Sequence, residues 1–214
     1  MASTAGYYES RFTYDHRRDV VWGEIVRDLA RRQLVSPQGA VVELGAGYCH
    51  CINQVQARRR IAVDLNPDFA QYATIGVEAI VQASDAALPL EDNSVDTVIA
   101  SNLFEHLTRE QLTRTAAEVR RILKPGGQLV AIQPNFYYCY REYFDDYTHV
   151  FVFTHNSLRD FFVAQGFSPW LIVPRYIPFS MRSRAPKARL LVSLYLRSPI
   201  RPFAKQMLLA WRKA

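Results

Sequence analysis

The stretch AVVELGAGYC, at residues 40–49, joins an apolar run to a glycine-rich turn. Residues 40–44 have the length and the apolar character of a buried strand, and Gly45 and Gly47 follow directly. Glycine lets a chain bend tightly and approach a ligand closely, and a helix start after such a turn presents its amide groups. We therefore expect a nucleotide-binding turn here, followed by a helix.

A second apolar run, at residues 61–64, ends in Asp64. A carboxylate about twenty residues after a glycine turn can accept hydrogen bonds from both hydroxyls of a ribose. Dinucleotide-dependent oxidoreductases share this geometry, so the pattern alone does not exclude them. Two features oppose that interpretation: His50 replaces the third glycine of G-x-G-x-x-G, and Glu43 lies inside the first strand, where it can face an amino group.

Apolar runs alternate with amphipathic stretches along the chain, which is typical of β–α–β units. Residues 66–68 (NPD) form a turn that we expect to start a further helix. The expected helices are 14–32, 110–123 and 155–165, and the expected strands are 40–44, 61–64, 78–82, 95–100, 128–133, and an antiparallel closing pair at 167–173 and 206–212.

The composition fits one soluble globular domain, with 214 residues, 49% hydrophobic and 21% charged. It argues against a disordered chain or a disulfide scaffold. No apolar run reaches the roughly 18 residues that a membrane-spanning helix needs, and the N-terminus lacks the apolar segment of a signal peptide. With three cysteines, these features favour a cytoplasmic protein.

Four motifs together resemble the class I S-adenosylmethionine-dependent methyltransferases, in their small-molecule branch. They are VVELGAGYC (41–49), AVDLNPD (62–68), ASDAALPLEDNSVDTVIASNLFEHL (83–107) and LKPGGQLVAIQPN (123–135). The resemblance implies an α/β, Rossmann-like fold: a seven-stranded sheet of order 3-2-1-4-5-7-6, with strand 7 antiparallel and helices on both faces.

That resemblance implies one domain over residues 1–214 and S-adenosylmethionine as its cofactor. The expected parts are an N-terminal helix (12–33), a cofactor-binding core (40–135), an aromatic substrate lid (136–154) and a basic insertion before the last strand (174–205). The family often has a third glycine where this chain has Cys49, and its N-terminal segment, here around Tyr14, often covers the cofactor. The residues implied to bind the cofactor are Glu43 (amino group), Gly45 and Gly47 (methionine moiety), Asp64 (ribose), Leu65, Asp85 and Ala86 (adenine), and Ser101 and Asn102 (methyl-donor site).

Residues 135–154 contain nine of the 27 aromatic residues and follow the fifth strand, where the fold has its acceptor site. Surface loops are rarely so aromatic, so we interpret this stretch as a substrate wall. His149 is the first candidate general base and His106 the second, because histidine titrates near neutrality. Alternatively, the aromatics pack a subdomain and His149 is structural. The candidate substrate contacts are Tyr137, Tyr140, Tyr143, Asp145 and Tyr147.

No metal site is expected. Cys49, His50 and Cys51 are the obvious candidates, but adjacent residues cannot easily wrap one tetrahedral zinc ion.

Charge is segregated along the chain. Residues 1–160 hold sixteen Lys and Arg against all twenty acids, whereas residues 161–214 hold ten Lys and Arg and no acid. Three explanations stay open for the basic end: an anionic membrane surface, an acidic substrate such as a phosphate-linked glycan carrier, and packing on the domain or on a second subunit in a homodimer. Nucleic acid is not favoured, because the first 160 residues are net acidic.

Residues 133–158 (QPNFYYCYREYFDDYTHVFVFTHNSL) are also similar, more loosely, to bacterial methyltransferases of cell-surface glycan biosynthesis. This likeness favours O-methylation of a small-molecule or saccharide acceptor, in the cytoplasm or peripherally at the membrane. Two alternatives stay open: a non-catalytic or partner-dependent protein with the methyltransferase fold and, less favoured, an NAD-dependent oxidoreductase.

Overall fold

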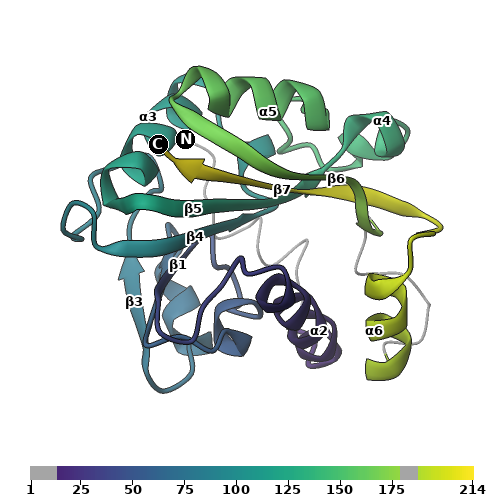
Figure 1. The fold of residues 1–214 in the computed structure, drawn as a ribbon, viewed down its shortest axis with the longest axis horizontal. Coiled ribbons are helices and arrows are strands. Elements are labelled where there is room, and N and C mark those ends of the chain that lie inside the picture. The colour runs from purple at the N-terminus through teal and green to yellow at the C-terminus, as the bar shows by residue number, and fades with distance from the viewer. Residues whose placement is uncertain (1–13, 179–187) are drawn as a thin grey trace.

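A seven-stranded sheet organises the computed structural model, which describes residues 14–178 and 188–214 (Figure 1). Its order is β3-β2-β1-β4-β5-β7-β6, which confirms the predicted order. The strands are β1 (Ala40–Leu44), β2 (Arg59–Asp64), β3 (Val77–Val81), β4 (Val95–Ser101), β5 (Leu123–Pro134), β6 (Phe167–Pro178) and β7 (Ala204–Lys213).

Strands β1 to β5 pair in parallel, whereas β7 runs antiparallel to both β5 and β6. Every residue of β1 is buried, as expected of a strand in the middle of a parallel sheet with both faces covered. The strand order reverses between β1 and β4. In open α/β sheets, ligands bind beyond the carboxyl ends of the strands at such a reversal.

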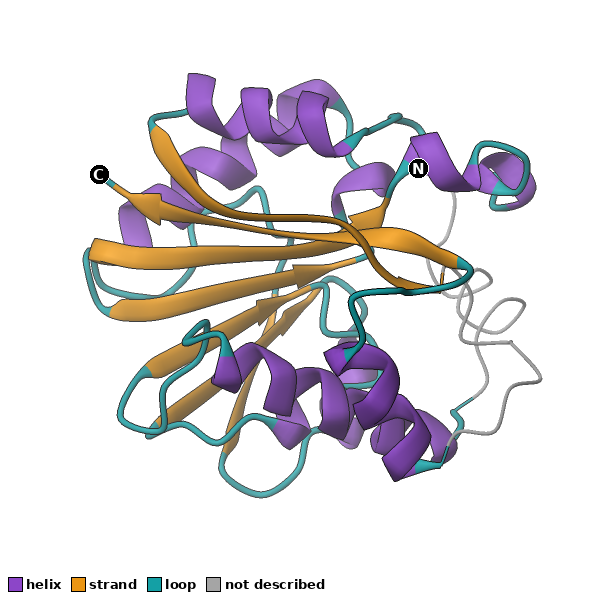
Figure 2. Cartoon of the chain, turned by 45° about the vertical axis from the view of Figure 1, so that its right-hand side comes forward, coloured by secondary structure: helices purple, strands orange, loops and turns teal. Residues whose placement is uncertain are grey.

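Helices cover both faces of the sheet (Figure 2). Helices α3 and α5 lie on one face, and α2 and α6 on the other (Figure 1). The described helices are α2 (Arg17–Arg31), α3 (Arg109–Ile122), α4 (Phe136–Cys139), α5 (His155–Ala164) and α6 (Arg189–Arg197), with 3-10 turns η1 (Ile52–Gln54), η2 (Pro67–Tyr72), η3 (Phe104–His106) and η4 (Tyr143–Asp145).

Local sequence explains where two of these helices begin. The side chains of Thr108 before α3 and Thr154 before α5 each accept a hydrogen bond from the backbone amide three residues on. The side chains of Gln111 and Ser157 in turn accept a hydrogen bond from the backbone amide of the threonine. Such capping boxes satisfy amide groups that a helix start leaves without partners.

Each face of the sheet has its own apolar layer. Under α5, the ring of Phe162 packs 4.7 Å from that of Trp211 on β7. Under α2, Ile25 and Leu29 are fully buried, and Tyr176 of β6 donates a hydrogen bond to Asp28 at 2.9 Å. Within the described ranges, no helix is both long enough and apolar enough to cross a bilayer.

Two expected helices are wrong. The turn after β1 leads only into η1, and residues 67–72 form the 3-10 turn η2. Gly45, Gly47 and Cys49 all have positive φ, between +52° and +67°, which is incompatible with a right-handed helix. Because the turn extends to Cys49, only the short segment between Cys49 and Arg59 is left for a helix before β2.

Candidate functional site

The glycine turn lies between the carboxyl ends of β1 and β2. The amide of Gly45 donates to the carbonyl of Val63 at 2.9 Å, which fastens the turn to β2. A Cβ atom at Gly45 would lie 3.1 Å from Cδ1 of Leu103, whereas one at Gly47 would meet no atom within 4 Å. Gly47 therefore faces open space in which a ligand can approach the backbone.

Asp64 ends β2 as a buried carboxylate beside this turn. Its Oδ2 accepts from the amide of Gly47 at 2.8 Å, and its Oδ1 from that of Asn66 at 2.9 Å. These two amides fix the plane of the carboxylate. Since each carboxylate oxygen has two lone pairs, the group can also accept hydrogen bonds from two neighbouring hydroxyls.

Glu43 is fully buried on β1, and its Oε2 accepts from the amide of Ile52 at 2.9 Å. Burial, with a smaller contribution from the charge of Asp64, raises the pKa of this carboxyl from 4.5 to about 8. An amino group close by would favour the ionised form. The turn, Asp64 and Glu43 thus fit a nucleoside that carries an amino acid.

Two of the three residues expected to contact the adenine already form interactions within the protein. Leu65 is 56% exposed, so it can pack on a ring. Asp85, however, forms an ion pair with Arg114 of α3, with Nη2 and Oδ2 2.6 Å apart. The amide of Ala86 donates to the carbonyl of Ala83 at 3.2 Å. A bound adenine would share these groups rather than find them without partners.

Ser101 and Asn102 lie at the end of β4, as the predicted strand requires. Asn102 adopts a φ of +49°, and its Oδ1 accepts from Nε2 of Gln206 on β7 at 2.7 Å. Its Nδ2 donates to Oγ of Ser101 at 3.1 Å. These bonds hold the backbone in a conformation that few L-residues adopt, and Asn is one of them.

Aromatic rings gather beside the glycine turn. Of these residues, only Tyr14 was expected from the sequence to lie near the cofactor. Tyr14 stacks on His50 and on Tyr72, with ring centroids 5.1 and 5.3 Å apart, and meets Tyr48 edge-on at 5.8 Å. The residues of this cluster come from three separate segments of the chain, so no local sequence pattern could predict it. His50 also pairs with Asp19 at 2.6 Å, which gives it a role unrelated to metal binding.

The aromatic stretch after β5 has an exposed and a buried part. Tyr143, expected to contact substrate, is instead fully buried and donates its hydroxyl to the carbonyl of Phe151. A long apolar ring with a satisfied hydroxyl suits a core position better than a surface one. Asp145 is exposed. The exposed aromatic residues are Tyr137, Tyr138, Tyr140, Phe144 and Tyr147.

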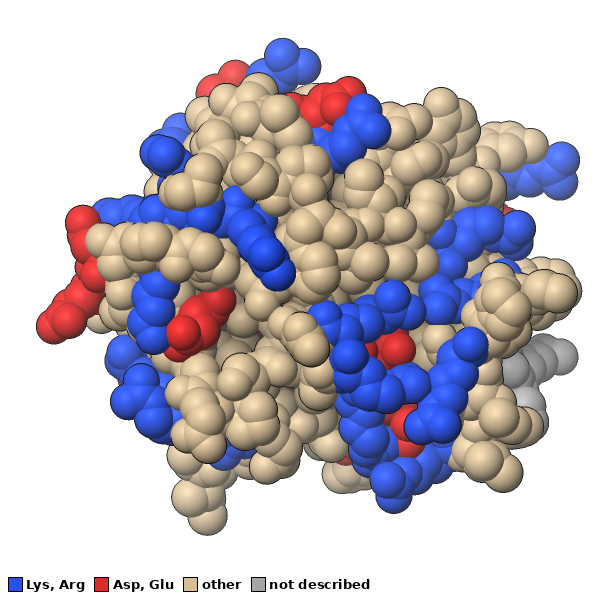
Figure 3. Space-filling view, viewed as in Figure 1, with Lys and Arg blue, Asp and Glu red and all other residues tan. Residues whose placement is uncertain are grey.

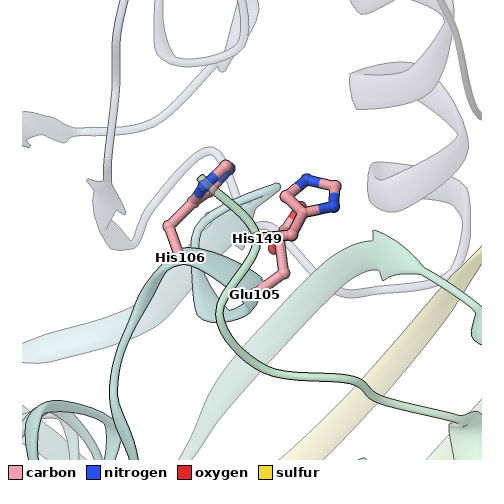
Figure 4. A group of neighbouring side chains, drawn as sticks. All are labelled: Glu105, His106 and His149. Atoms are coloured by element: carbon pink, nitrogen blue, oxygen red, sulfur yellow. The ribbon is translucent and has the colours of Figure 1, made fainter. Parts of the chain in front are cut away.

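The two candidate bases, His106 and His149, lie together, with ring centroids 4.9 Å apart. His106 belongs to η3 and is half-buried, whereas His149 follows η4 and is buried. Glu105 joins them: one donor atom from each of the three side chains lies within 4.8 Å of the others (Figure 4). Sequence reasoning missed Glu105, although its place beside His106 after β4 was a usable signal.

The basic end packs partly on the domain. Leu196 of α6 is buried, and Arg189 forms an ion pair with Glu24 of α2 at 2.9 Å. Lys and Arg side chains gather over α2 and α6, at the lower right of Figure 3. The basic surface therefore includes arginines of α2 as well. Residues 179–187 of the expected insertion lie outside the described residues. The exposed apolar residues of α6 are Leu190, Leu191 and Leu194.

Comparison with known proteins supplies family information. A family model described as a methyltransferase domain matches residues 42–131. Malonyl-[acyl-carrier protein] O-methyltransferase of Methylococcus capsulatus is 31% identical over 153 residues, which cover 64% of this chain and 54% of that protein. The chain spans about half, or less, of the length of the first curated relatives that it matches.

Solved structures share the fold. Geranyl diphosphate C-methyltransferase from Streptomyces coelicolor, in complex with Mg²⁺, geranyl diphosphate and S-adenosyl-L-homocysteine, superposes with a TM-score of 0.65 at 15% identity, covering 93% of this chain and 82% of that one. A Haloferax volcanii methyltransferase in complex with the Trm112 activator has a TM-score of 0.66 at 18% identity, covering 94% and 99%.

Proposed function

We propose that the chain is a class I S-adenosylmethionine-dependent methyltransferase and that it transfers the methyl group to a hydroxyl oxygen of a small-molecule or saccharide acceptor. The observation that carries the proposal is the pairing of His106 with His149 beyond the carboxyl end of β4. A hydroxyl is a weak nucleophile until it loses its proton, and a pair of imidazoles beside the methyl-donor site suits that task.

S-adenosylmethionine, the cofactor of this family, supplies a methyl group on a positively charged sulfur. The residues present fit it. We propose that Gly45 and Gly47 approach the methionine moiety, that Glu43 receives its amino group, and that Asp64 binds the ribose hydroxyls. Leu65 offers an exposed apolar side chain for the adenine, with Asp85 and Ala86 at its edge, and Ser101 and Asn102 border the methyl-donor site.

The chemistry required of the chain itself is alignment and proton removal. As the acceptor oxygen forms its bond to the methyl carbon, the carbon–sulfur bond breaks with its electron pair on sulfur, and the hydroxyl proton leaves. Correct alignment of the acceptor accounts for much of the rate of such a transfer. His106, the more accessible of the two rings, is placed to take the proton.

The exposed face of the lid supports an acceptor with both apolar and hydroxyl surface. Tyr137, Tyr140 and Tyr147 are each more than half exposed. A tyrosine ring offers an apolar body and a polar tip, which suits a saccharide. The malonyl-[acyl-carrier protein] relative is named as an O-methyltransferase, which also supports an oxygen acceptor.

The surface of α6 supports an acceptor attached to a lipid or phosphate, and peripheral binding to an anionic membrane. Leu190, Leu191 and Leu194 are at least half exposed beside arginines, a combination typical of helices that lie in a membrane interface. The same exposed leucines can also bury themselves in a homodimer. We further propose that residues 1–214 form one domain in the cytoplasm, since one sheet takes in every described strand.

A second candidate is a methyltransferase that needs a protein partner. The Haloferax volcanii neighbour in complex with an activator supports it. In this case the isolated chain binds S-adenosylhomocysteine but transfers no methyl group until the partner is added.

The test is transfer of labelled methyl groups from S-adenosylmethionine into an extract of the source cell, separated into lipid, aqueous and protein fractions. Label in an ether or ester of a lipid-linked or free saccharide supports the proposal. Label on nitrogen or carbon refutes the oxygen acceptor, and no label despite tight S-adenosylhomocysteine binding favours the partner-dependent alternative. His106→Gln and His149→Gln are each expected to lower transfer by roughly 100-fold or more, with His16→Ala on the exposed surface as the control.

A further inference from the structure

Glu105 is buried, and its carboxyl group has no hydrogen-bonding partner among residues 14–178 and 188–214. Only 1% of the residue is exposed, and within the described residues neither carboxylate oxygen has a partner. Leaving a buried acceptor unsatisfied costs roughly 1–3 kcal/mol, and more when it is charged. Buried carboxylates in proteins are normally paired or bound to a metal ion. The buried carboxyl of Glu105 is therefore a candidate metal ligand.

The two neighbouring imidazoles are held in a fixed tautomer. Nδ1 of His149 lies 2.6 Å from the carbonyl oxygen of Tyr143, which only accepts, so this nitrogen carries the hydrogen. Nδ1 of His106 lies 3.0 Å from Oγ1 of Thr148 and 3.3 Å from the carbonyl oxygen of the same residue. Because the Thr148 hydroxyl donates to Asp146 at 2.6 Å, both of these oxygens accept, and Nδ1 of His106 carries the hydrogen as well. The lone pair of each neutral ring is then on Nε2. Histidines that bind metals are oriented in this way, through a hydrogen bond from the other ring nitrogen.

The distances suit one ion. The donor atoms lie within 4.8 Å of one another, and the three side chains project into the same region (Figure 4). A transition-metal ion holds nitrogen and oxygen ligands at about 2.0–2.2 Å, so its ligands are about 3–4 Å apart. Because His106 is only half-buried, we expect its side chain to rotate towards the ion when the ion binds.

The carboxyl of Glu105 also lies near that of Asp146. Burial, with a smaller contribution from the charge of Asp146, raises the pKa of Glu105 to about 8. A divalent ion would stabilise both carboxylates. Two imidazoles and one carboxylate are a donor set typical of zinc and non-haem iron sites, whereas magnesium prefers oxygen ligands throughout.

We propose that Glu105, His106 and His149 bind one divalent transition-metal ion beside the acceptor site. Three protein ligands leave coordination positions for an oxygen of the acceptor, and a divalent ion lowers the pKa of a hydroxyl bound to it. With an ion bound, the two histidines would be its ligands and would no longer accept the proton; the hydroxyl, made more acidic by the ion, would lose its proton to solvent water. The effect of the ion on the acceptor hydroxyl rests on the proposed O-methylation, whereas the proposed metal binding does not.

The experiment measures metal binding without any acceptor. The protein carries no histidine tag and is stripped with a chelator, and Co²⁺ is titrated while its visible absorption is recorded. The expected result is one equivalent bound, displaced by Zn²⁺ and not by Mg²⁺. Glu105→Gln and His149→Gln are expected to weaken Co²⁺ binding at least 100-fold. His16→Ala, which removes a histidine outside the cluster, is expected to leave it unchanged.

Absence of stoichiometric Co²⁺ binding, or equal binding by Glu105→Gln, would overturn the proposed site. Glu105→Gln keeps the shape of the side chain and replaces a buried ionisable group with a neutral one, so the metal-free variant is expected to melt at or above the temperature of the metal-free wild type. That result separates loss of a ligand from loss of the fold. A protein that binds Co²⁺ but methylates no hydroxyl refutes the proposed function alone.

Discussion

Asp64→Asn tests the cofactor site most directly. The substitution keeps the shape of the side chain, removes its charge and turns one acceptor oxygen into a donor nitrogen. In the wild type the carboxylate already accepts from the amides of Gly47 and Asn66, at 2.8 and 2.9 Å. Asparagine has a single acceptor oxygen for these two amides and for both ribose hydroxyls, so at least one hydrogen bond to the ribose is lost.

A hydrogen bond to a charged group contributes about 1.5–3 kcal/mol. Loss of one such bond corresponds to a roughly 10- to 150-fold increase in the Kd for S-adenosylhomocysteine. Isothermal titration calorimetry measures this change directly, and circular dichroism shows whether the variant is folded. Asp68→Asn is the matched control, because this exposed aspartate is four residues further on. A folded Asp64→Asn variant with a Kd within twofold of the wild type would refute the ribose role.

Three further predictions concern other parts of the molecule. Because burial raises the pKa of Glu43 to about 8, the folded state retains a proton that the unfolded state loses near pH 4.5. Urea titrations should therefore show that the wild type loses stability relative to Glu43→Gln as the pH rises from 5 to 8. Over the same pH range the wild type should bind S-adenosylhomocysteine more tightly. Parallel pH profiles of the wild type and Glu43→Gln would contradict this prediction. Tyr143→Phe should lower the free energy of unfolding by about 1–2 kcal/mol, because the carbonyl of Phe151 loses its donor, and an unchanged urea midpoint would count against a structural role. Leu194→Glu should reduce co-sedimentation with anionic vesicles several-fold, whereas Ile75→Glu, on a different exposed turn, should not; equal effects would argue against α6 as a membrane surface.

Much of the sheet follows from local sequence. The run 40–44 is a parallel central strand buried on both faces, which is why four of its five residues are apolar and only Glu43 is not. The capping boxes at Thr108 and Thr154 likewise mark helix starts within four residues of sequence. Such signals depend on neighbours in the chain, and so they can be recognised without the fold.

The helix expected after the glycine turn was wrong for a related reason. The pattern identified the turn but not how many of its residues have positive φ. Cys49 at +56° takes the left-handed conformation in which the family often has glycine. A cysteine gives no sequence signal of positive φ, so the sequence did not show that the turn extends to residue 49 and that only the 3-10 turn η1 follows it.

Sequence by itself predicted the strand order, which the structure confirms, and the expected cofactor, because the four motifs in fixed order carry the family resemblance that implies both. Tertiary structure alone decided which chemical groups meet. Glu105 and His149 lie 44 residues apart in the chain, and they come together only because the segment after β5 folds back over η3, where the amides of Val150 and Phe151 donate to the carbonyl of Glu105. Burial depends on such distant contacts. It is burial that separates Tyr143 from the exposed tyrosines beside it and leaves the carboxylate of Glu105 without a partner in the described chain.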